Sequence, residues 1–312
     1  MANSNLLRVP ASKFSGKVII YCEGRNTEPS YFKLLKKHCT VEPVPQRGGG
    51  VGCCTNFVNT VIKQHENRRD RLKYQHKWIV FDCDGHDDYA QAIQTANAYG
   101  FEVAFSNMCI EYWFLLHLID HDGRPIPLPL QQSHGYHSQS QINMINGEIR
   151  RYNSHRTAGQ KEIQEYDPGS KTVEEDFFDL LMATNPDSGQ SRLADAYFRA
   201  KSIHEKKRGT GNEFDESVST MYKLIDALGI EIVTPEQDFI KQLQQKNSIQ
   251  NLSLKGDKIY IGNTFVCRVT STRPNYVIEV ANGGKTTFEE QHDCIVYVTN
   301  IIKSITTQVI DQ

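Results

Sequence analysis

Long apolar runs are missing from this 312-residue sequence, and no stretch approaches the ~18 consecutive apolar residues that a membrane-spanning helix needs. The opening segment, MANSNLLRVPASKFSGK, lacks the apolar core of a secretory signal. A P-loop, the Gly-rich motif ending in Lys and Ser or Thr that cradles nucleotide phosphates, is also absent. We therefore expect a cytoplasmic protein without a membrane partner.

An excess of charge of either sign is also missing. The 35 Lys and Arg residues nearly balance 37 Asp and Glu residues, and the formal net charge is −2. This balance excludes a uniformly basic nucleic-acid binder but leaves local basic patches open. The eight cysteines form no Cys-x-x-Cys pair, so a zinc ribbon or knuckle is not expected. Several lie within apolar runs, where reduced cysteine acts as a small hydrophobic residue.

Short strand-like runs alternate with helical patterns over the first third of the chain. These runs are rich in β-branched and aromatic residues, and turn residues follow them. The predicted strands are Lys17–Cys22, Val41–Val44, Lys77–Phe81 and Phe101–Phe105. This alternation is typical of a parallel sheet with helices on its faces. We therefore predict an α/β fold.

The chain changes character twice after this region. Residues 120–135 are rich in Pro, Gly and Asp, and further helical patterns follow them. After Pro235, short β-rich runs separated by turns predict an antiparallel meander, followed by a helix or strand at Cys294–Ile305. We predict four parts, which are a disordered lead-in at 1–16, an α/β domain at 17–119, a helical extension at 120–233 and a small β-rich domain at 234–312.

Acidic residues follow two of the predicted strands at the point where each strand ends. Glu23 follows Lys17–Cys22, and Asp82 and Asp84 follow Lys77–Phe81. Functional groups collect beyond the carboxyl ends of parallel strands, and alternate residues of an extended chain point the same way. Because like charges raise each other's pKa, a hard divalent cation would relieve the repulsion among these carboxylates. The sequence therefore predicts a site for Mg²⁺ (or Mn²⁺).

Helix capping is a simpler explanation for other polar residues near these strand ends. Asp87 and Asp88 are predicted in the first turn of the next helix, where the helix dipole favours carboxylates. Thr27 is predicted as the N-cap of the helix that follows the first strand. Ser106 or Asn107 can cap the helix that begins after the fourth strand.

Three sequence blocks, CEGRNTEPSYF, FDCDGHDD and SNMCIEYWFLLH, together resemble the RloB family. Proteins of that family are similar to Toprim domains, the metal-binding fold shared by topoisomerases, primases and OLD-type nucleases. The resemblance covers residues 17–230, with a weaker block at Glu213–Leu228, and implies a Toprim-like sheet. The sequence departs from the family at Ile110, where an aromatic is usual, and at Gly85, which interrupts the acidic run. The β-rich tail lies outside the family core.

The resemblance also implies roles for individual residues. By motif, Glu23 matches the Toprim glutamate, Asp82 and Asp84 match its Asp-x-Asp pair, and Glu111 matches the acidic residue of the third block. The other matching residues of that block are Ser106, Asn107, Trp113 and His117. The family implies a phage-defence nuclease, and some relatives act beside an ABC-type ATPase and cleave RNA, including tRNA.

The catalytic candidates are therefore Glu23, Asp82, Asp84, Glu111 and His117. Glu23 is a metal ligand or a general acid/base, and Glu111 is a third or outer ligand. His117, within an apolar helix face, is either catalytic or a buried structural histidine. The substrate-binding candidates are Arg25, Lys33, Ser106 and Asn107. Arg25 and Lys33 either hold phosphate beside Glu23 or pair with surface carboxylates.

These residues favour a metal-dependent endonuclease, with RNA preferred to DNA as the expected substrate. The basic groups at 68–73, 150–156 and 206–208 either follow an RNA backbone or form solvated surface. One alternative is a non-catalytic binding or regulatory subunit of a defence complex that senses a partner or a nucleotide signal. A second is a nucleotidyl transferase on the same metal site. The sequence leaves open an ABC-type ATPase partner and a homo-oligomer.

Overall fold

The computed structural model divides the chain into two compact units. The first comprises Met1–Ala183 with Ser191–Ile232, and the second comprises Thr184–Gln190 with Val233–Gln312. The residues that the structure describes are 17–46, 53–83, 86–127, 138–157, 159–210, 217–233, 243–244, 252–255, 258–261, 264–272, 275–280, 283–288 and 291–310. The lead-in at 1–16 and Asp84 with Gly85 lie outside these residues.

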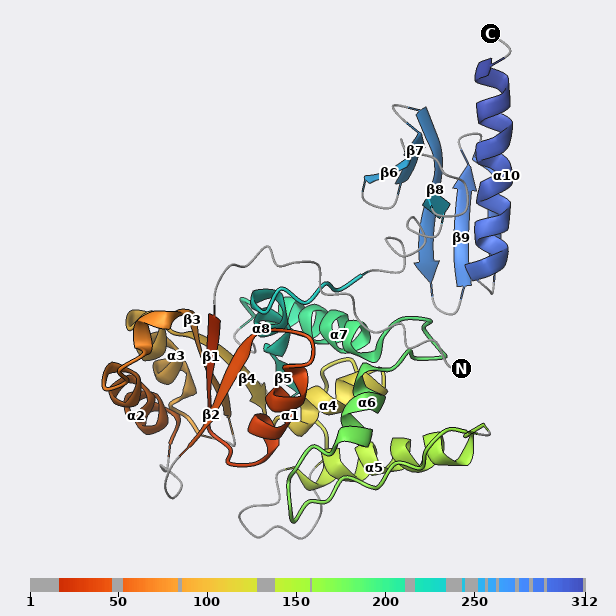
Figure 1. Ribbon diagram of the computed structural model, residues 1–312. Coiled ribbons are helices and arrows are strands. Elements are labelled where there is room, and N and C mark those ends of the chain that lie inside the picture. The colour runs from red at the N-terminus through yellow and green to blue at the C-terminus, as the bar shows by residue number, and fades with distance from the viewer. Residues whose placement is uncertain are drawn as a thin grey trace. The chain divides into compact units, whose positions relative to one another are not determined.

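A five-stranded sheet forms the centre of the first unit, in the order β2-β1-β3-β4-β5 (Figure 1). Its strands are β1 (Lys17–Cys22), β2 (Val41–Pro45), β3 (Tyr74–Asp82), β4 (Glu102–Asn107) and β5 (Val218–Ser219). The first four strands are parallel, and the short β5 pairs antiparallel with β4. The predicted α/β fold is confirmed, because the apolar runs are buried in the sheet as parallel strands usually are.

Helices from both the predicted α/β domain and its helical extension surround this sheet (Figure 1). They are α1 (Thr27–Leu35), α2 (Cys54–Glu66), the 3-10 turn η1 (Arg71–Lys73), α3 (Tyr89–Ala98), α4 (Glu111–Leu118), α5 (Gln139–Ser154), α6 (Glu175–Met182), α7 (Arg192–Lys207) and α8 (Met221–Ala227). Helix α4 contacts β4 and β5 and also packs on α5, α6 and α7. The helical extension therefore shares one core with the sheet. None of the described helices is long and apolar enough to cross a membrane.

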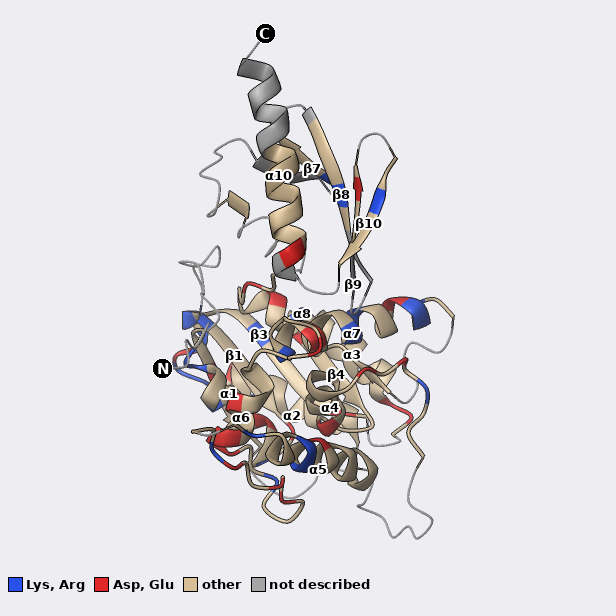
Figure 2. Ribbon diagram, turned by 90° about the vertical axis from the view of Figure 1, so that its right-hand side faces the viewer, with Lys and Arg blue, Asp and Glu red and all other residues tan. Residues whose placement is uncertain are grey.

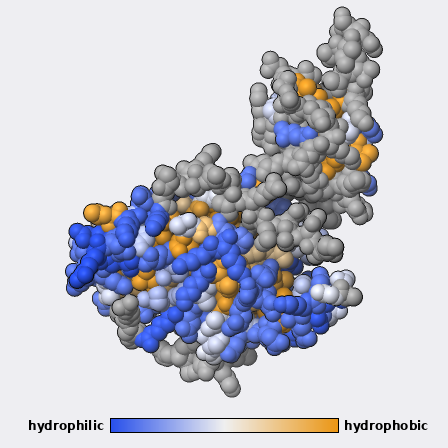
Figure 3. Space-filling view, in the orientation of Figure 1, coloured by the Kyte–Doolittle hydropathy of each residue, from blue (hydrophilic) through white to orange (hydrophobic). Residues whose placement is uncertain are grey.

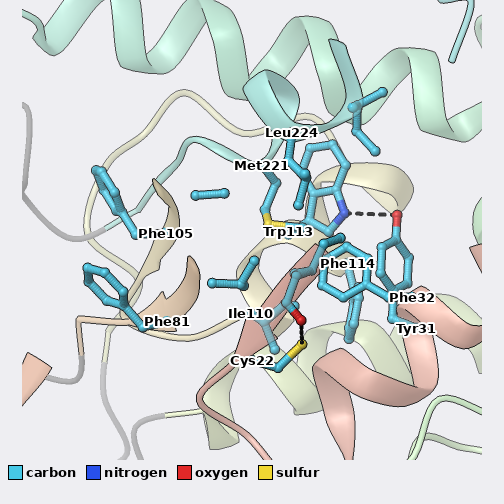
Figure 4. Packing of buried hydrophobic residues seen from close by; sticks show 14 of the residues in the cluster. Cys22, Tyr31, Phe32, Phe81, Phe105, Ile110, Trp113, Phe114, Met221 and Leu224 are labelled. Carbon is cyan, nitrogen blue, oxygen red and sulfur yellow. Dashed lines mark hydrogen bonds between the residues drawn. The ribbon is translucent and has the colours of Figure 1, made fainter. Parts of the chain in front are cut away.

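Large aromatic side chains fill this core (Figure 4). Trp113 of α4 and Tyr31 of α1 are both completely buried, and the Trp113 indole Nε1 donates a hydrogen bond of 3.1 Å to the Tyr31 hydroxyl. This bond satisfies two polar atoms that burial would otherwise leave unpaired at a cost of about 1–3 kcal/mol each. Hydrophilic residues cover most of the visible face of the first unit (Figure 3).

The second unit contains an antiparallel sheet in the order β10-β9-β8-β7-β6, which bears out the predicted meander. Its strands are β6 (Leu252–Lys255), β7 (Lys258–Ile261), β8 (Thr264–Thr272), β9 (Asn275–Val280) and β10 (Lys285–Phe288). Sequence patterning missed β10, which is short and largely polar. The segment predicted as helix or strand is a helix, α10 (Gln291–Ile310), which packs on β8, β9 and β10. Its buried residues share a small core with the sheet, including Cys294, Val298 and Ile302.

The predictions that Thr27 and Asp88 support the starts of their own helices were wrong. Thr27 is the first residue of α1 rather than its N-cap, and its hydroxyl donates to the Lys171 carbonyl at 2.8 Å. Asp88 precedes its own helix, but its carboxylate accepts the backbone N–H groups of Cys54 at 3.2 Å and Thr55 at 2.8 Å, at the start of α2. The carboxylate therefore caps a neighbouring helix, a pairing that local sequence does not reveal.

Replacing Asp88 with alanine should lower the free energy of unfolding by about 1 kcal/mol at neutral pH, because two N–H groups of α2 lose their acceptor. Hydrogen bonds from Thr55, Cys53 and Cys54 overcome the opposing effect of burial and hold the pKa of Asp88 at about 2, below the ordinary 3.8. The stabilisation is therefore present above pH 3.8 and lost as the pH falls towards 2.

Urea unfolding followed by tryptophan fluorescence measures this difference, since both tryptophans, Trp78 and Trp113, lie in the first unit's core. Asp87→Ala is the matched control, because Asp87 is exposed one residue away. Equal unfolding energies for wild type and Asp88→Ala at neutral pH would contradict the capping role.

Candidate functional site

Glu23 and Asp82 lie side by side at the carboxyl ends of adjacent parallel strands. Glu23 directly follows β1, and its N–H donates to the Val80 carbonyl at 3.0 Å, continuing the pairing of β1 with β3. Asp82 is the last residue of β3, and its backbone N–H donates to Glu23 Oε2 at 3.0 Å. Two of the three residues predicted to bind metal are therefore brought together. The third, Asp84, lies outside the described residues.

Sequence analysis missed a buried carboxylate beside this pair, Glu28 in the first turn of α1. Glu28 is only 3% exposed, and its Oε1 accepts the backbone N–H of Gly24 at 3.1 Å. A Cβ atom at Gly24 would lie 1.9 Å from Glu28 Oε2, so a side chain at this position would displace the Glu28 carboxylate. The available signal was an acidic residue five positions after Glu23, which resembles an ordinary helix-dipole residue.

Burial, with a smaller effect of the nearby Glu111 carboxylate, raises the pKa of Glu28 from 4.5 to about 7. The Glu28 and Gly24 backbone N–H groups and the Lys171 cation act in the opposite direction. A carboxyl with this pKa exchanges its proton near neutral pH, as a general acid/base requires.

Glu111 is the first residue of α4 and is 2% exposed. Its Oε1 accepts a hydrogen bond of 3.2 Å from the Tyr166 hydroxyl. Tyr166 is itself fixed by Asn146 of α5, whose side chain accepts the Tyr166 N–H at 2.7 Å and donates to the Tyr166 carbonyl at 3.0 Å. The helical extension thus orients an acidic residue that acts electrostatically on Glu28 (acidic residues are red in Figure 2).

The donors gathered here are carboxylate oxygens, which suit a hard cation such as Mg²⁺. Mg²⁺ is commonly held by one or two carboxylates together with water and substrate phosphate, and Glu23 and Asp82 supply such a pair. Within the described part of the chain, no group of three or more His, Cys, Asp or Glu side chains is arranged to hold a metal ion. The donor chemistry therefore fits a divalent cation bound by few protein ligands.

His117 lies apart from these hydrogen-bonded carboxylates. It is completely buried, and its Nδ1 lies 2.9 Å from the Trp113 carbonyl of its own helix. Burial lowers the pKa of His117 to about 3, so the imidazole is neutral at physiological pH. The charged groups that act on it, Asp195 and Arg199 among them, belong to α7. These contacts agree with the structural alternative for this histidine.

The four substrate-binding candidates divide into two kinds. Ser106 and Asn107 are buried and joined to the β5 region, through a 2.9 Å hydroxyl contact between Ser106 and Ser219 and through the Asn107 carbonyl. Neither caps α4, which has no side-chain cap, so that expectation was wrong. Arg25 and Lys33 are exposed, on the loop before α1 and on α1 itself.

Several arginines of the predicted basic groups pair with acidic residues. Arg68 hydrogen bonds to Glu42 at 2.8 Å and to Asp70 at 3.0 Å. The other pairs are Arg150 with Glu165, Arg151 with Glu148 and Arg156 with Glu162. Pairing cancels much of the local positive charge, which weakens these groups as candidates for binding a polyanion.

The family model described as RloB-like protein matches residues 18–228. Because this match spans more than half of the chain, the protein belongs to the RloB-like family, as the three blocks predicted. The match covers β1 through α8, and with them Glu23, Asp82 and Glu111, but none of the strands of the second unit. Comparison with curated proteins and with solved structures gave no match.

The Glu28→Gln variant should be more stable than wild type at high pH, when both are studied with a metal chelator. The raised pKa of Glu28 means that folding favours its protonated form. This stabilisation is complete below pH 4.5 and is lost as the pH rises through about 7. Glutamine cannot ionise, yet its carbonyl can still accept the Gly24 N–H.

Urea unfolding is measured near pH ~5 and pH ~8. Between these two conditions, the free energy of unfolding of Glu28→Gln should rise relative to that of wild type by up to about 3 kcal/mol. Glu102→Gln, at an exposed position, serves as the control. A stability difference that stays constant with pH would show that Glu28 does not titrate in this range.

Proposed function

We propose that this protein is a metal-dependent endonuclease that hydrolyses phosphodiesters, with RNA such as tRNA as its substrate, in antiphage defence. The observation that carries the proposal is the hydrogen bond from the Asp82 N–H to the Glu23 carboxylate, which places the Glu23 side chain against the backbone of Asp82 at adjacent strand ends. Membership of the RloB-like family supports it. The cytoplasm is the proposed location, and an ABC-type ATPase is the proposed partner.

In this proposal Glu23 and Asp82, together with Asp84, hold Mg²⁺ or Mn²⁺. A divalent ion bound there supplies positive charge to the non-bridging phosphate oxygens and to the attacking and leaving oxygens. The backbone N–H of Asp82 orients Glu23 by donating a hydrogen bond to its Oε2. Such support matters because loss of an orienting partner typically weakens metal binding or activity about 10–100-fold.

Glu28 and Glu111 have different roles in this mechanism. With a pKa of about 7, Glu28 is present near neutral pH both as the carboxylate, which can accept a proton from an attacking water, and as the carboxylic acid, which can donate one to a leaving oxygen. Glu111, fixed by the Tyr166 hydroxyl, keeps negative charge near Glu28 and thereby helps to hold its pKa high. Gly24 fixes the position of the Glu28 carboxyl through its N–H.

Incubation of the purified protein with total cellular RNA and with plasmid DNA, each with Mg²⁺ or Mn²⁺, tests the function. We expect discrete RNA fragments with wild type and a loss of at least about 100-fold with Glu23→Gln or Asp82→Asn, because each removes a charged ligand. Glu102→Gln, which changes an exposed carboxylate at the far end of β4, should cleave like wild type.

Sequencing the fragment ends identifies the cleavage site. Thermal unfolding of the same variants separates loss of the site from loss of the fold. Expression in infected cells tests the defence role, and protection that survives Asp82→Asn would favour the non-catalytic alternative.

A further inference from the structure

The loop at 166–173, between α5 and α6, is fixed to the start of α1. We call the group of Glu23, Glu28, Asp82 and Glu111 described above the acidic site, and the loop lies next to it. The Asn26 side chain donates to the Ser170 carbonyl at 3.0 Å, and the Thr27 hydroxyl donates to the Lys171 carbonyl at 2.8 Å. In return, the Val173 N–H donates to the Ser30 hydroxyl at 2.8 Å. These bonds bracket Glu28, so the loop and the buried carboxylate keep a constant relative position.

The loop also has its own internal support. The Asp167 side chain accepts the N–H groups of Gly169 at 2.8 Å and Ser170 at 3.1 Å, and the Asp167 carbonyl accepts the Lys171 N–H at 3.0 Å. At the start of the loop, the Tyr166 hydroxyl binds Glu111. The loop therefore contacts the acidic site at two places, at Glu111 and at the first turn of α1.

Lys171 has an unusual backbone conformation within this loop. Its φ angle is +49°, in the left-handed region that glycine tolerates and that residues with a Cβ atom rarely adopt. Strained conformations of this kind persist only where the surroundings impose them, and they cluster at functional sites. The bonds made by its own carbonyl and N–H impose the conformation here.

The Lys171 side chain is exposed, and no carboxylate of the described residues lies within ion-pair distance of its ammonium group. It nevertheless acts electrostatically on Glu28. The arginines of the predicted basic groups described above, Arg68, Arg150, Arg151 and Arg156, are paired. Lys171 instead lies in a loop fixed beside buried carboxylates that would repel a nucleic acid. A lysine ammonium is a compact point charge that commonly binds phosphate.

We propose that the loop at 166–173 is a phosphate-binding loop, in which Lys171 contacts a phosphodiester of the substrate next to the acidic site. The proposal rests on the nuclease function proposed above and assigns the residue that holds the polyanion against its carboxylates. It also accounts for a strained lysine at a position that glycine would fill at lower cost in stability.

Binding of a fluorescein-labelled single-stranded RNA, measured by anisotropy at several salt concentrations, tests the proposal. The Asp82→Asn background keeps the RNA intact. Adding Lys171→Gln should weaken binding and reduce the slope of log affinity against log salt by about 0.7–1, because one phosphate contact is lost. Lys171→Arg keeps the charge and should retain the slope. Lys161→Gln, at another exposed lysine of the same connection, is the matched control and should leave binding unchanged.

The Lys171→Gly variant distinguishes a functional lysine from a structural one. Glycine accepts a positive φ without strain, so we expect a higher melting temperature together with the same loss of RNA affinity. A lysine with only a structural role would show no loss of affinity in either variant.

An unchanged salt slope in both Lys171→Gln and Lys171→Gly, with RNA binding intact, would overturn the phosphate-binding role while leaving the nuclease function standing. Cleavage by wild type is measured in parallel. If wild type neither binds nor cleaves RNA or DNA, the proposed function itself fails, and the role of Lys171 falls with it.

Discussion

The parallel pairing of β1 with β3 is the constraint on which the acidic site depends. It continues one residue past β1, where the Glu23 N–H binds Val80, and this extension places the Glu23 side chain against the backbone of Asp82. Both strands are buried, so their register is fixed by apolar packing around residues such as Ile20 and Ile79. The energy that holds the two strand ends, and with them Glu23 and Asp82, in adjacent positions therefore comes from the hydrophobic core.

Burying a carboxylate beside other carboxylates is costly, and the chain offsets the cost locally. The Glu28 carboxylate accepts a hydrogen bond from the Gly24 N–H, and the Glu111 carboxylate accepts one from the Tyr166 hydroxyl. Both acidic side chains are nearly inaccessible, although they lie in the first turns of their helices, where the dipole favours negative charge. The site is consequently built from α1, α4 and the loop at 166–173 as much as from the sheet. This is why the helical extension belongs to the same compact unit as the strands.

The second unit is organised on different principles. Its antiparallel sheet and α10 form a separate small core, and the family match ends before its first strand. The family match therefore covers β1 through α8 of the first unit and none of the strands of the second.

Local patterns in the sequence were sufficient for most elements of the fold. Apolar runs that end in acidic residues predicted the strands β1 and β3 and the positions of Glu23 and Asp82 at their ends, because a buried parallel strand needs a continuous apolar run. Gly100, with φ of +73°, follows the C-terminal end of α3 in the left-handed conformation that glycine favours, which depends only on local backbone geometry. The polar strand β10 was missed because its residues are half exposed and carry no apolar pattern.

The sequence by itself thus determined the α/β class, the family and the strand ends that carry Glu23 and Asp82. Only the tertiary structure decided the partners of the remaining polar side chains. Asp88 caps α2 rather than its own helix, and Glu28 is buried rather than exposed in a first helical turn. Lys171 reaches the same site from a loop more than a hundred residues away in the chain. The physical reason is that burial and hydrogen bonding depend on groups distant in sequence, and the local periodicity of the sequence does not reveal those groups.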